Sequence, residues 1–349
     1  MTEENENSYR IGVGIVGSGM VTRSIHLPAL AALSDRFQVR AIWDIDPELA
    51  KATAQTCGAS APAKLDELLG GPGMDVVVIC SPAAFHAEQA IAALRAGTKV
   101  VLVEKPLCTS LEEAEAIAQA ARETGGTVVV GAMHLFDPAW QFMAEQVAKQ
   151  DTPAGLIRSC IILPPNARFD SWASETIGTP APRQPVQRTL AMMMRISMLE
   201  LAIHDLPLVR RLLREDTPEV LYAKRLTPFG YMVTIRAGQQ TVDLFAFMHG
   251  HWRPEWTLTA TAHDWHATAE FTPSFVMAGS GSASMATSGT SLSMSPKSHN
   301  GYAGEWLAID GVLRGELPHP NPDDFVKDFA FALSIAEQAS ALIAAGEAQ

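Results

Sequence analysis

The chain has 349 residues, enough for about two domains, and its 47% hydrophobic and 18% charged residues are typical of a globular protein rather than a disordered one. Its net charge of −12 argues against a nucleic-acid-binding protein, which needs a basic face. The four cysteines, Cys57, Cys80, Cys108 and Cys160, include no Cys-x-x-Cys pair. The sequence therefore shows no metal or disulfide framework and fits a reduced cytoplasm.

The start of the chain and its apolar runs give no sign of export or of a membrane. Residues 2–7 are acidic and polar, unlike a secretory signal or a transit peptide. No apolar run in the sequence is long enough to span a membrane. We therefore expect a cytoplasmic protein that binds neither membrane nor nucleic acid.

The first predicted element is a strand at residues 12–16, which leads into a glycine-rich turn and then a helical pattern. Strand, glycine turn and helix together form the context of a dinucleotide-binding site. Gly17 permits the tight turn, and Gly19 lets a pyrophosphate approach the helix N-terminus, where free N–H groups favour an anion. The third glycine position holds Thr22, so the motif is imperfect.

A second predicted strand, residues 39–43, ends at Asp44. An acidic residue some 20 positions beyond the glycines can accept the ribose hydroxyls of NAD and repels a 2′-phosphate. An ordinary loop aspartate is the alternative interpretation. Asp46 and Pro47 then predict the N-cap and the first position of a helix.

The alternation of strands and helices continues to residue 130. Helices are expected at residues 66–69, 86–96 and 111–122, and strands at 75–80, 100–103 and 127–130. Ser81 and Pro82 follow the strand at 75–80, and His86 opens the next helix. Repeated β-α-β units predict a doubly wound parallel sheet.

Lys105 stands at the end of the strand at residues 100–103, between Glu104 and Pro106. Proline disfavours a helix at the residue before it, so Lys105 is expected to be extended. Ligands of open α/β sheets bind outside the carboxyl ends of the strands, where this lysine would present a cation. A surface ion pair at a strand exit is the alternative.

Taken in order, four motifs resemble the glucose–fructose oxidoreductase / inositol dehydrogenase / MocA (Gfo/Idh/MocA) family. They are Gly-Ile-Val-Gly-Ser-Gly at 14–19, Asp44, Ser-Pro-x-x-x-His at 81–86 and Glu-Lys-Pro at 104–106. The resemblance covers nearly all of the first 140 residues and implies a Rossmann domain at residues 1–132 that binds NAD rather than NADP. The residues expected at the cofactor are Gly17, Gly19, Met20, Val21, Asp44, Ser81, Pro82, His86, Glu104 and Lys105.

The resemblance further implies a substrate-binding and oligomerisation α+β domain at residues 133–349. Where the family usually reads Tyr-Asn-x-Arg-Phe-x-Pro, residues 132–138 have Met133 and Leu135 in place of the amide and the cation. We interpret the neighbouring His134 as structural. Residues 164–188 predict a long proline-rich loop, either a functional lid or a solvated basic loop, whose arginines are Arg168, Arg183 and Arg188.

A helical pattern over residues 192–213 carries Glu200 and His204 four positions apart, hence on one helical face. The segment at 200–204 resembles the family's Asp-x-Gly-x-His motif, with Glu for Asp and Ala for Gly. With Lys105 it resembles the family's catalytic trio. An ordinary surface contact is the alternative for this pair, and Asp205 is interpreted as a helix-face residue.

The remaining chain predicts a largely antiparallel sheet with strands at residues 219–226, 232–236, 241–247, 255–261 and 265–271. One face would be open for a second subunit, which predicts a homodimer or homotetramer. His249, His251, His263 and His266 lack the spacing of a metal site, so no metal is expected. Residues 278–298 are expected to be a flexible or weakly structured connection, and residues 323–344 a terminal amphipathic helix.

These observations predict an NAD(P)-dependent dehydrogenase or reductase that transfers a hydride between the nicotinamide and a carbon of a small-molecule substrate. His204 would be the general base, Lys105 would stabilise the same oxygen by charge, and Glu200 would orient His204 or bind a neighbouring hydroxyl. The resemblance implies a sugar, sugar derivative or cyclitol. Two alternatives stay open: a cofactor-binding sensor or regulator without turnover, and a reductase of a non-sugar carbonyl, imine or aromatic diol.

Overall fold

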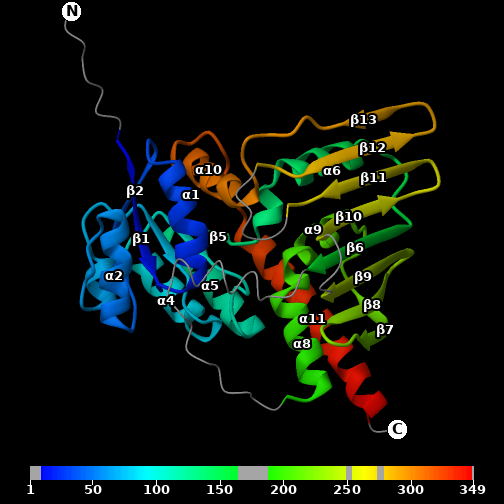
Figure 1. Ribbon diagram of the computed structural model, residues 1–349, viewed down its shortest axis with the longest axis horizontal. Coiled ribbons are helices and arrows are strands. Elements are labelled where there is room, and N and C mark those ends of the chain that lie inside the picture. The colour runs from blue at the N-terminus through cyan, green and yellow to red at the C-terminus, as the bar shows by residue number, and fades with distance from the viewer. Residues whose placement is uncertain (1–8, 164–187, 249–253, 273–278, 348–349) are drawn as a thin grey trace, which may run out of the picture. The chain divides into compact units, whose positions relative to one another are not determined.

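The computed structural model describes residues 9–163, 188–248, 254–272 and 279–347, to which all structural statements refer (Figure 1). Arg168, Arg183, His249 and His251, and with them nearly all of the predicted loop at 164–188, lie outside the described residues. The chain forms two compact units, Met1–Gly131 with Trp306–Phe325, and Ala132–Glu305 with Val326–Gln349. A division at residue 132 therefore leaves out a late segment that packs with the first unit.

The first unit is built on a five-stranded parallel sheet in the order β2-β1-β3-β4-β5. Three of its strands, β1, β3 and β4, are buried along their whole length, as expected for a parallel sheet covered on both faces. The doubly wound parallel sheet predicted from the sequence is confirmed. The strands are β1 (Ile11–Val16), β2 (Phe37–Trp43), β3 (Val76–Ile79), β4 (Val100–Val103) and β5 (Thr127–Val130).

Two helices of this unit, α2 (Pro47–Cys57) and α5 (Leu111–Thr124), begin and end at residues with identifiable capping roles. Asp46 caps α2 by accepting hydrogen bonds from the N–H groups of Glu48 and Leu49, and Gly58 closes the helix at φ +70°. Ser110 caps α5 in the same way. The helical elements are η1 (Thr22–His26), α1 (Leu27–Ala32), α2 (Pro47–Cys57), α3 (Leu65–Leu69), η2 (Ala83–Phe85), α4 (His86–Arg95) and α5 (Leu111–Thr124).

The second unit contains an eight-stranded sheet in the order β13-β12-β11-β10-β6-β9-β8-β7. All its pairs are antiparallel except β6 with β9, so the largely antiparallel sheet expected from the sequence is confirmed. The strands are β6 (Leu156–Leu163), β7 (Glu219–Arg225), β8 (Gly230–Ala237), β9 (Gln240–Met248), β10 (Glu255–Thr261), β11 (Trp265–Glu270), β12 (Ser282–Thr287) and β13 (Ser291–Ser293).

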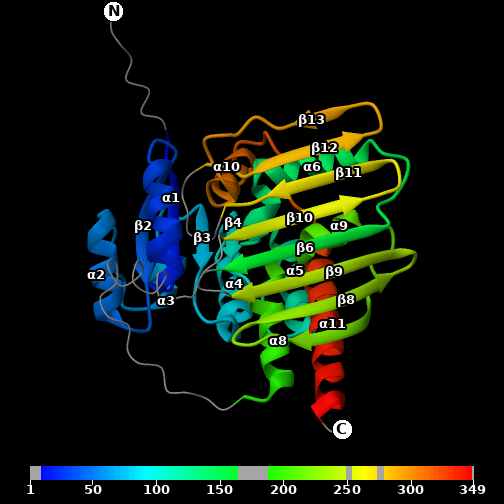
Figure 2. The same cartoon turned by 45° about the vertical axis from the view of Figure 1, so that its right-hand side comes forward.

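Helices pack on one face of this sheet and form its core, and Figure 2 shows the strands in front of them. Along β10 the side chains alternate, with Trp256, Leu258 and Ala260 buried against the helices. Two further helices, α10 (Gly301–Leu313) and α11 (Pro322–Glu347), have residues in both units. The other helical elements are η3 (Met133–Phe136), α6 (Pro138–Ala148), α8 (Leu190–Glu200), η4 (Ala202–His204) and α9 (Leu206–Leu212).

Two predictions about local structure are wrong. The single helix expected over residues 192–213 is divided into α8, η4 and α9, because Pro207 lacks an N–H and starts a new helix rather than continuing the old one. The flexible connection expected at 278–298 contains β12 and β13. β12 pairs with β11 and buries Ala283 and Met285.

Helix α11 also corrects the expectation that no segment could cross a membrane. Of the described helices, it alone is long and apolar enough to do so by length and composition, and 33% of its apolar stretch is buried. Its Phe331, Ile335 and Ala339 belong to the core of the second unit, and Asp328 is paired with Arg210 and Arg211. These contacts are those of a core helix.

Candidate functional site

The glycine turn after β1 is held by close backbone contacts within the first unit. Gly17 has φ +100°, and a Cβ placed on it would lie 2.8 Å from the carbonyl carbon and oxygen of Cys80. Only glycine fits there. Thr22, which occupies the third glycine position, is buried and donates its hydroxyl to the Gly17 carbonyl at 2.6 Å. Thr22, which departs from the glycine motif, therefore stabilises the turn. Gly19, Met20 and Val21 remain at least partly exposed.

Asp44, at the end of β2, is joined to this turn. Its Oδ2 accepts a hydrogen bond from the Ser18 N–H at 2.6 Å, and its Oδ1 accepts one from the Asp46 N–H at 2.9 Å. Each carboxylate oxygen can accept a further bond. The predicted ribose-binding residue is thus held beside the predicted pyrophosphate-binding turn.

The segment after β3 is fixed by His86, which is buried. Its Nε2 lies 2.7 Å from the Ser81 carbonyl oxygen and its Nδ1 lies 2.9 Å from the Pro106 carbonyl oxygen. Ser81 donates its hydroxyl to Gln89 at 2.6 Å, and Pro82 is exposed. Among the predicted cofactor residues, His86 therefore holds together the two loops that follow β3 and β4.

Glu104 and Lys105 follow β4. The Glu104 carboxylate is buried, lies 3.0 Å from His26 Nε2, and accepts the Lys105 backbone N–H at 3.1 Å. Gly131 leaves room for it, since a Cβ there would lie 3.2 Å from the carboxylate. Burial favours the neutral acid, but the hydrogen bond from His26 and the charges of His26 and Lys105 hold the pKa of Glu104 below its usual range.

His26 and Cys80 were not singled out from the sequence. Burial opposes a charge on His26, yet its contacts with Cys80 and Glu104 outweigh burial and raise its pKa well above the usual value. The partners lie 54 and 78 positions from His26 in the chain, so no local spacing could reveal the cluster. A histidine in the helix after a glycine turn was the only available signal.

In the second unit, His204 is buried and lies in the short turn η4. Its Nδ1 is 3.1 Å from the sulfur of Met133, and its ring meets the Trp256 ring edge to face at a centroid distance of 5.4 Å. Glu200 is exposed at the end of α8. The argument that one helical face carries both residues is wrong, because the helix ends between them.

Asp205 corrects a second expectation, since it is fully buried rather than on a helix face. Its carboxylate accepts hydrogen bonds from Ser159 Oγ at 2.6 Å, from His134 Nδ1 at 2.9 Å and, with both oxygens at 2.9 Å, from Trp256 Nε1. The His134 ring stacks on Phe271 at 4.0 Å. These contacts fit the structural interpretation of His134.

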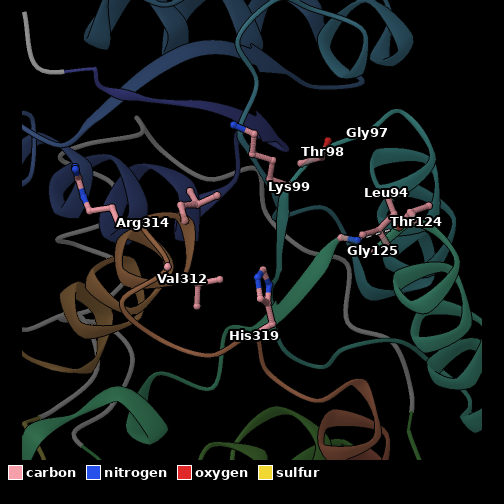
Figure 3. A pocket seen from close by; sticks show the side chains of 12 residues that line it. Leu94, Gly97, Thr98, Lys99, Thr124, Gly125, Val312, Arg314 and His319 are labelled. Carbon is pink, nitrogen blue, oxygen red and sulfur yellow. Dashed lines mark hydrogen bonds between the residues drawn. The ribbon is translucent and has the colours of Figure 1, made fainter.

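No group of three or more His, Cys, Asp or Glu residues suited to a metal ion occurs among the described residues. A cavity of about 540 Å³ lies at the amino ends of β4 and β5, the opposite end of β4 from Lys105 (Figure 3). Its cations Lys99 and Arg314 are paired with Asp75 and Asp310, at 2.8 and 2.7 Å. The cavity is therefore separate from the glycine turn and offers no unbalanced charge.

The first unit is similar to a known protein family. Residues 11–132 match the protein family described as "Oxidoreductase family, NAD-binding Rossmann fold" (GFO_IDH_MocA). The chain is 31% identical over 152 residues to inositol 2-dehydrogenase 3 of Saccharopolyspora erythraea, which is 43% of this chain and 44% of that protein. It is 34% identical over 136 residues to 4-carboxy-2-hydroxymuconate-6-semialdehyde dehydrogenase of a Sphingobium species, which is 39% of this chain and 42% of the relative. Each match spans less than half of the relative.

The likeness to solved structures extends over both units. The crystal structure of UDP-N-acetylglucosamine 3-dehydrogenase from Acidithiobacillus ferrooxidans superposes with a TM-score of 0.73. The match covers 96% of this chain and 99% of that one at 18% sequence identity. At that identity the likeness shows a shared fold.

Proposed function

We propose that the chain is an NAD(P)-dependent dehydrogenase or reductase of a small molecule, because residues 11–132 match the Gfo/Idh/MocA oxidoreductase family with its NAD-binding Rossmann fold. The observation that carries the proposal is the glycine turn with Asp44 hydrogen-bonded to it. Both stand at the carboxyl ends of β1 and β2, where open α/β sheets bind dinucleotides. Residues 1–132 would bind the cofactor, and residues 133–349 the substrate.

The chemistry assigned to the chain's own residues is proton transfer and charge stabilisation. A bound nicotinamide supplies the acceptor or donor of hydride. His204 takes the proton of the substrate hydroxyl through Nε2, since Nδ1 is directed at the Met133 sulfur. Lys105 stabilises the developing negative charge on the same oxygen. Glu200 orients His204 or binds a neighbouring hydroxyl.

We infer that the cofactor is NAD rather than NADP. The residue after Asp44 is Ile45, which is 87% exposed and offers no cation to a 2′-phosphate. The Asp44 carboxylate repels that group, although the Arg23 guanidinium interacts with the carboxylate from the glycine turn. Fluorescence titration of the purified protein with NADH and NADPH tests this inference, and tighter binding of NADPH would overturn it.

A sugar, sugar derivative or cyclitol is the substrate class that the family favours, and inositol 2-dehydrogenase 3 is one relative. A less polar carbonyl, imine or aromatic diol is the second candidate. It is favoured by the sulfur of Met133, 3.1 Å from His204 Nδ1 where the family pattern has an amide. The semialdehyde dehydrogenase among the relatives is named for a non-sugar carbonyl compound. Turnover measured on a panel of cyclitols, nucleotide sugars and aromatic diols distinguishes the two.

Substitutions at the trio test the catalytic assignment. Lys105→Ala and His204→Ala should each lower turnover by about 10²–10⁴-fold, the usual contribution of a general base, while NADH affinity changes little. Glu200→Gln should cost less, because the amide keeps the shape and hydrogen bonding. The exposed residues Lys149 and His266 provide matched controls, Lys149→Ala and His266→Ala, with unchanged turnover. Wild-type turnover in Lys105→Ala would refute the mechanism, and NADH binding without turnover of any panel member would favour the sensor.

We further propose that the outer face of the eight-stranded sheet pairs two or more copies of the chain. Leu221 and Tyr222 on β7 and Met232 on β8 are large apolar side chains that are 42–48% exposed. Symmetric pairing would bury them. Light scattering at micromolar concentration should give the mass of a dimer or tetramer. A monomer would contradict the proposal.

A further inference from the structure

Two consecutive residues of η3 contact two consecutive residues at the end of η4, within the second unit. Met133 lies against His204, with its sulfur 3.1 Å from the imidazole Nδ1. His134 lies against Asp205, with its Nδ1 2.9 Å from a carboxylate oxygen. All four residues are buried. The two histidines are thus alike in burial and differ in what their Nδ1 atoms meet, which is a neutral thioether for one and a carboxylate for the other.

The Met133 thioether determines which nitrogen of a neutral His204 carries the proton. A neutral imidazole has one N–H group, and its other nitrogen has a lone pair that accepts. A thioether sulfur has no hydrogen to donate and can only accept a hydrogen bond. Nδ1 must therefore carry the proton in this contact, and the lone pair lies on Nε2. An imidazole without such a partner favours the opposite form, with its proton on Nε2.

Other contacts hold both partners in place. A Cβ on Gly301 would lie 2.0 Å from the Met133 carbonyl oxygen, so a close approach that only glycine allows fixes the backbone of Met133. The His204 N–H donates to the Leu201 carbonyl at 3.2 Å, and the His204 ring packs edge to face on Trp256. The contact between the sulfur and Nδ1 is therefore preorganised by the surrounding backbone and rings.

We propose that Met133 is a positioning residue for His204: its thioether accepts the Nδ1–H and thereby keeps the lone pair on Nε2, the nitrogen that takes the proton of the substrate hydroxyl. In this step the substrate O–H bond breaks and an N–H bond forms at Nε2, while Nδ1 keeps its proton. The effect on turnover rests on the proposed function, whereas the tautomer of His204 does not.

His134 provides an internal reference for the tautomer. The Asp205 carboxylate accepts hydrogen bonds from His134 Nδ1, Ser159 and Trp256. An ionised carboxylate can only accept, so His134 also carries its proton on Nδ1. This bond does not involve residue 133. A variant that removes only the Met133 sulfur should therefore change the tautomer of His204 and leave that of His134 as it is.

The first test is NMR of the whole protein with isotope-labelled histidine nitrogens, whose chemical shifts distinguish a protonated from an unprotonated ring nitrogen. The chain has ten histidines, and the His204 and His134 signals are identified by their loss in His204→Gln and His134→Gln. At mildly alkaline pH, where an ordinary imidazole is neutral, both should be in the Nδ1–H form.

Met133→Leu keeps the apolar volume and removes the acceptor. It should shift His204 toward the Nε2–H form, while unchanged His134 signals show that the fold around it is retained. Met143→Leu, at a buried methionine of the same core, is the matched control and should leave both histidines unchanged.

The second test is turnover of the panel member that the wild-type protein converts fastest. Met133→Leu should lower kcat by about tenfold, the order of magnitude that one hydrogen bond contributes to an equilibrium. Its NADH affinity should stay that of the wild type. Met143→Leu should retain both the kcat and the NADH affinity of the wild type.

Three NMR results would overturn the proposal: an Nε2–H form of His204 in the wild type, an unchanged His204 tautomer in Met133→Leu, or an equal change at His134 in that variant. A shifted His204 tautomer with the kcat of the wild type would show that Met133 does not position the base. If the wild-type protein turns over no member of the panel, the proposed function fails, while the NMR spectra still decide the tautomer.

Discussion

Each unit contains a buried histidine paired with a carboxylate, and the two pairs differ in what surrounds them. In the first unit His26 and Glu104 lie 3.0 Å apart beside Cys80 and the Lys105 backbone. In the second unit His134 and Asp205 lie 2.9 Å apart. Both pairs bring together residues more than 70 positions apart in sequence. The same two chemical groups therefore serve in two different environments.

The difference lies in how many hydrogen-bond donors the carboxylate accepts. Asp205 accepts bonds from Ser159, Trp256 and His134, and aromatic rings of Trp256 and Phe271 enclose the histidine. Glu104 has one backbone donor besides its histidine, and the charge of Lys105 acts on it as well. A fully bound carboxylate among aromatic rings holds a core together. A carboxylate among titratable groups keeps a charge in place beside reactive atoms.

The largest expected effect concerns the second pair. Asp205→Ala should destabilise the protein by about 3–5 kcal/mol, because it leaves several buried donors without an acceptor. Asp243→Ala, at a half-exposed carboxylate of the same sheet, is the matched control and should cost about 1 kcal/mol or less. Urea unfolding followed by tryptophan fluorescence measures both. Equal losses in the two variants would show that Asp205 does not organise the core.

The first pair should make stability depend on pH. The pKa of His26 is raised in the folded protein, and an unfolded histidine titrates near about 6.5. Below that pH both states hold the proton, and the full contribution of His26 is present. Above it the unfolded state releases the proton first, so stability falls as pH rises toward the folded pKa, by up to about 1.4 kcal/mol per pH unit.

Urea midpoints at pH 6.5, 7.5 and 8.5 measure this slope. Glu104→Gln removes the partner charge and should flatten it over the same range. Lys99 and Tyr9 are paired with Asp75, and their raised pKa values affect the stability of the protein at a more alkaline pH. A wild-type slope no steeper than that of Glu104→Gln would mean that the pair does not hold its proton in the way described.

The parts of the fold that could be predicted are those in which local sequence decides local structure. The strands of the first unit are continuous apolar runs, and glycine, proline and capping residues mark their ends, so the parallel sheet and the glycine turn follow from the sequence. Asp205 could not be placed, because its partners are 46 to 71 positions away. Helix α10 was missed because its largely buried residues show no amphipathic period.

The proposed catalytic trio illustrates the same limit. Lys105 was predicted from its place at a strand end and His204 from a family motif. Each prediction used only the sequence around its own residue. The spacing of Glu200 and His204 assumed a continuous helix, which Pro207 divides. Periodicity reports which face of a helix a residue occupies only where the helix continues. Pro207, three residues beyond the motif, is the sequence signal that the helix does not continue.

The smallest expected effect compares one capping motif in the two units. Asp46-Pro47 and Asp137-Pro138 both begin a helix with an aspartate N-cap and a proline at the first position. Asp46 is exposed and accepts two N–H groups of its own helix, at 3.1 and 3.2 Å. Asp137 is buried and accepts the Ala139 N–H at 2.8 Å and the distant Gly301 N–H at 3.1 Å.

Asp46→Ala should therefore cost about 1 kcal/mol, the usual value of an exposed cap. Asp137→Ala should cost about 1 kcal/mol more, because it also leaves the buried N–H of Gly301 without its acceptor. Asp137→Asn keeps an acceptor oxygen for one of the two donors only, since they bind different carboxylate oxygens, and should recover only part of the loss. Urea midpoints of the three variants, measured at one pH, give the difference directly. Equal losses for Asp46→Ala and Asp137→Ala would show that the bond to Gly301 adds nothing to the cap.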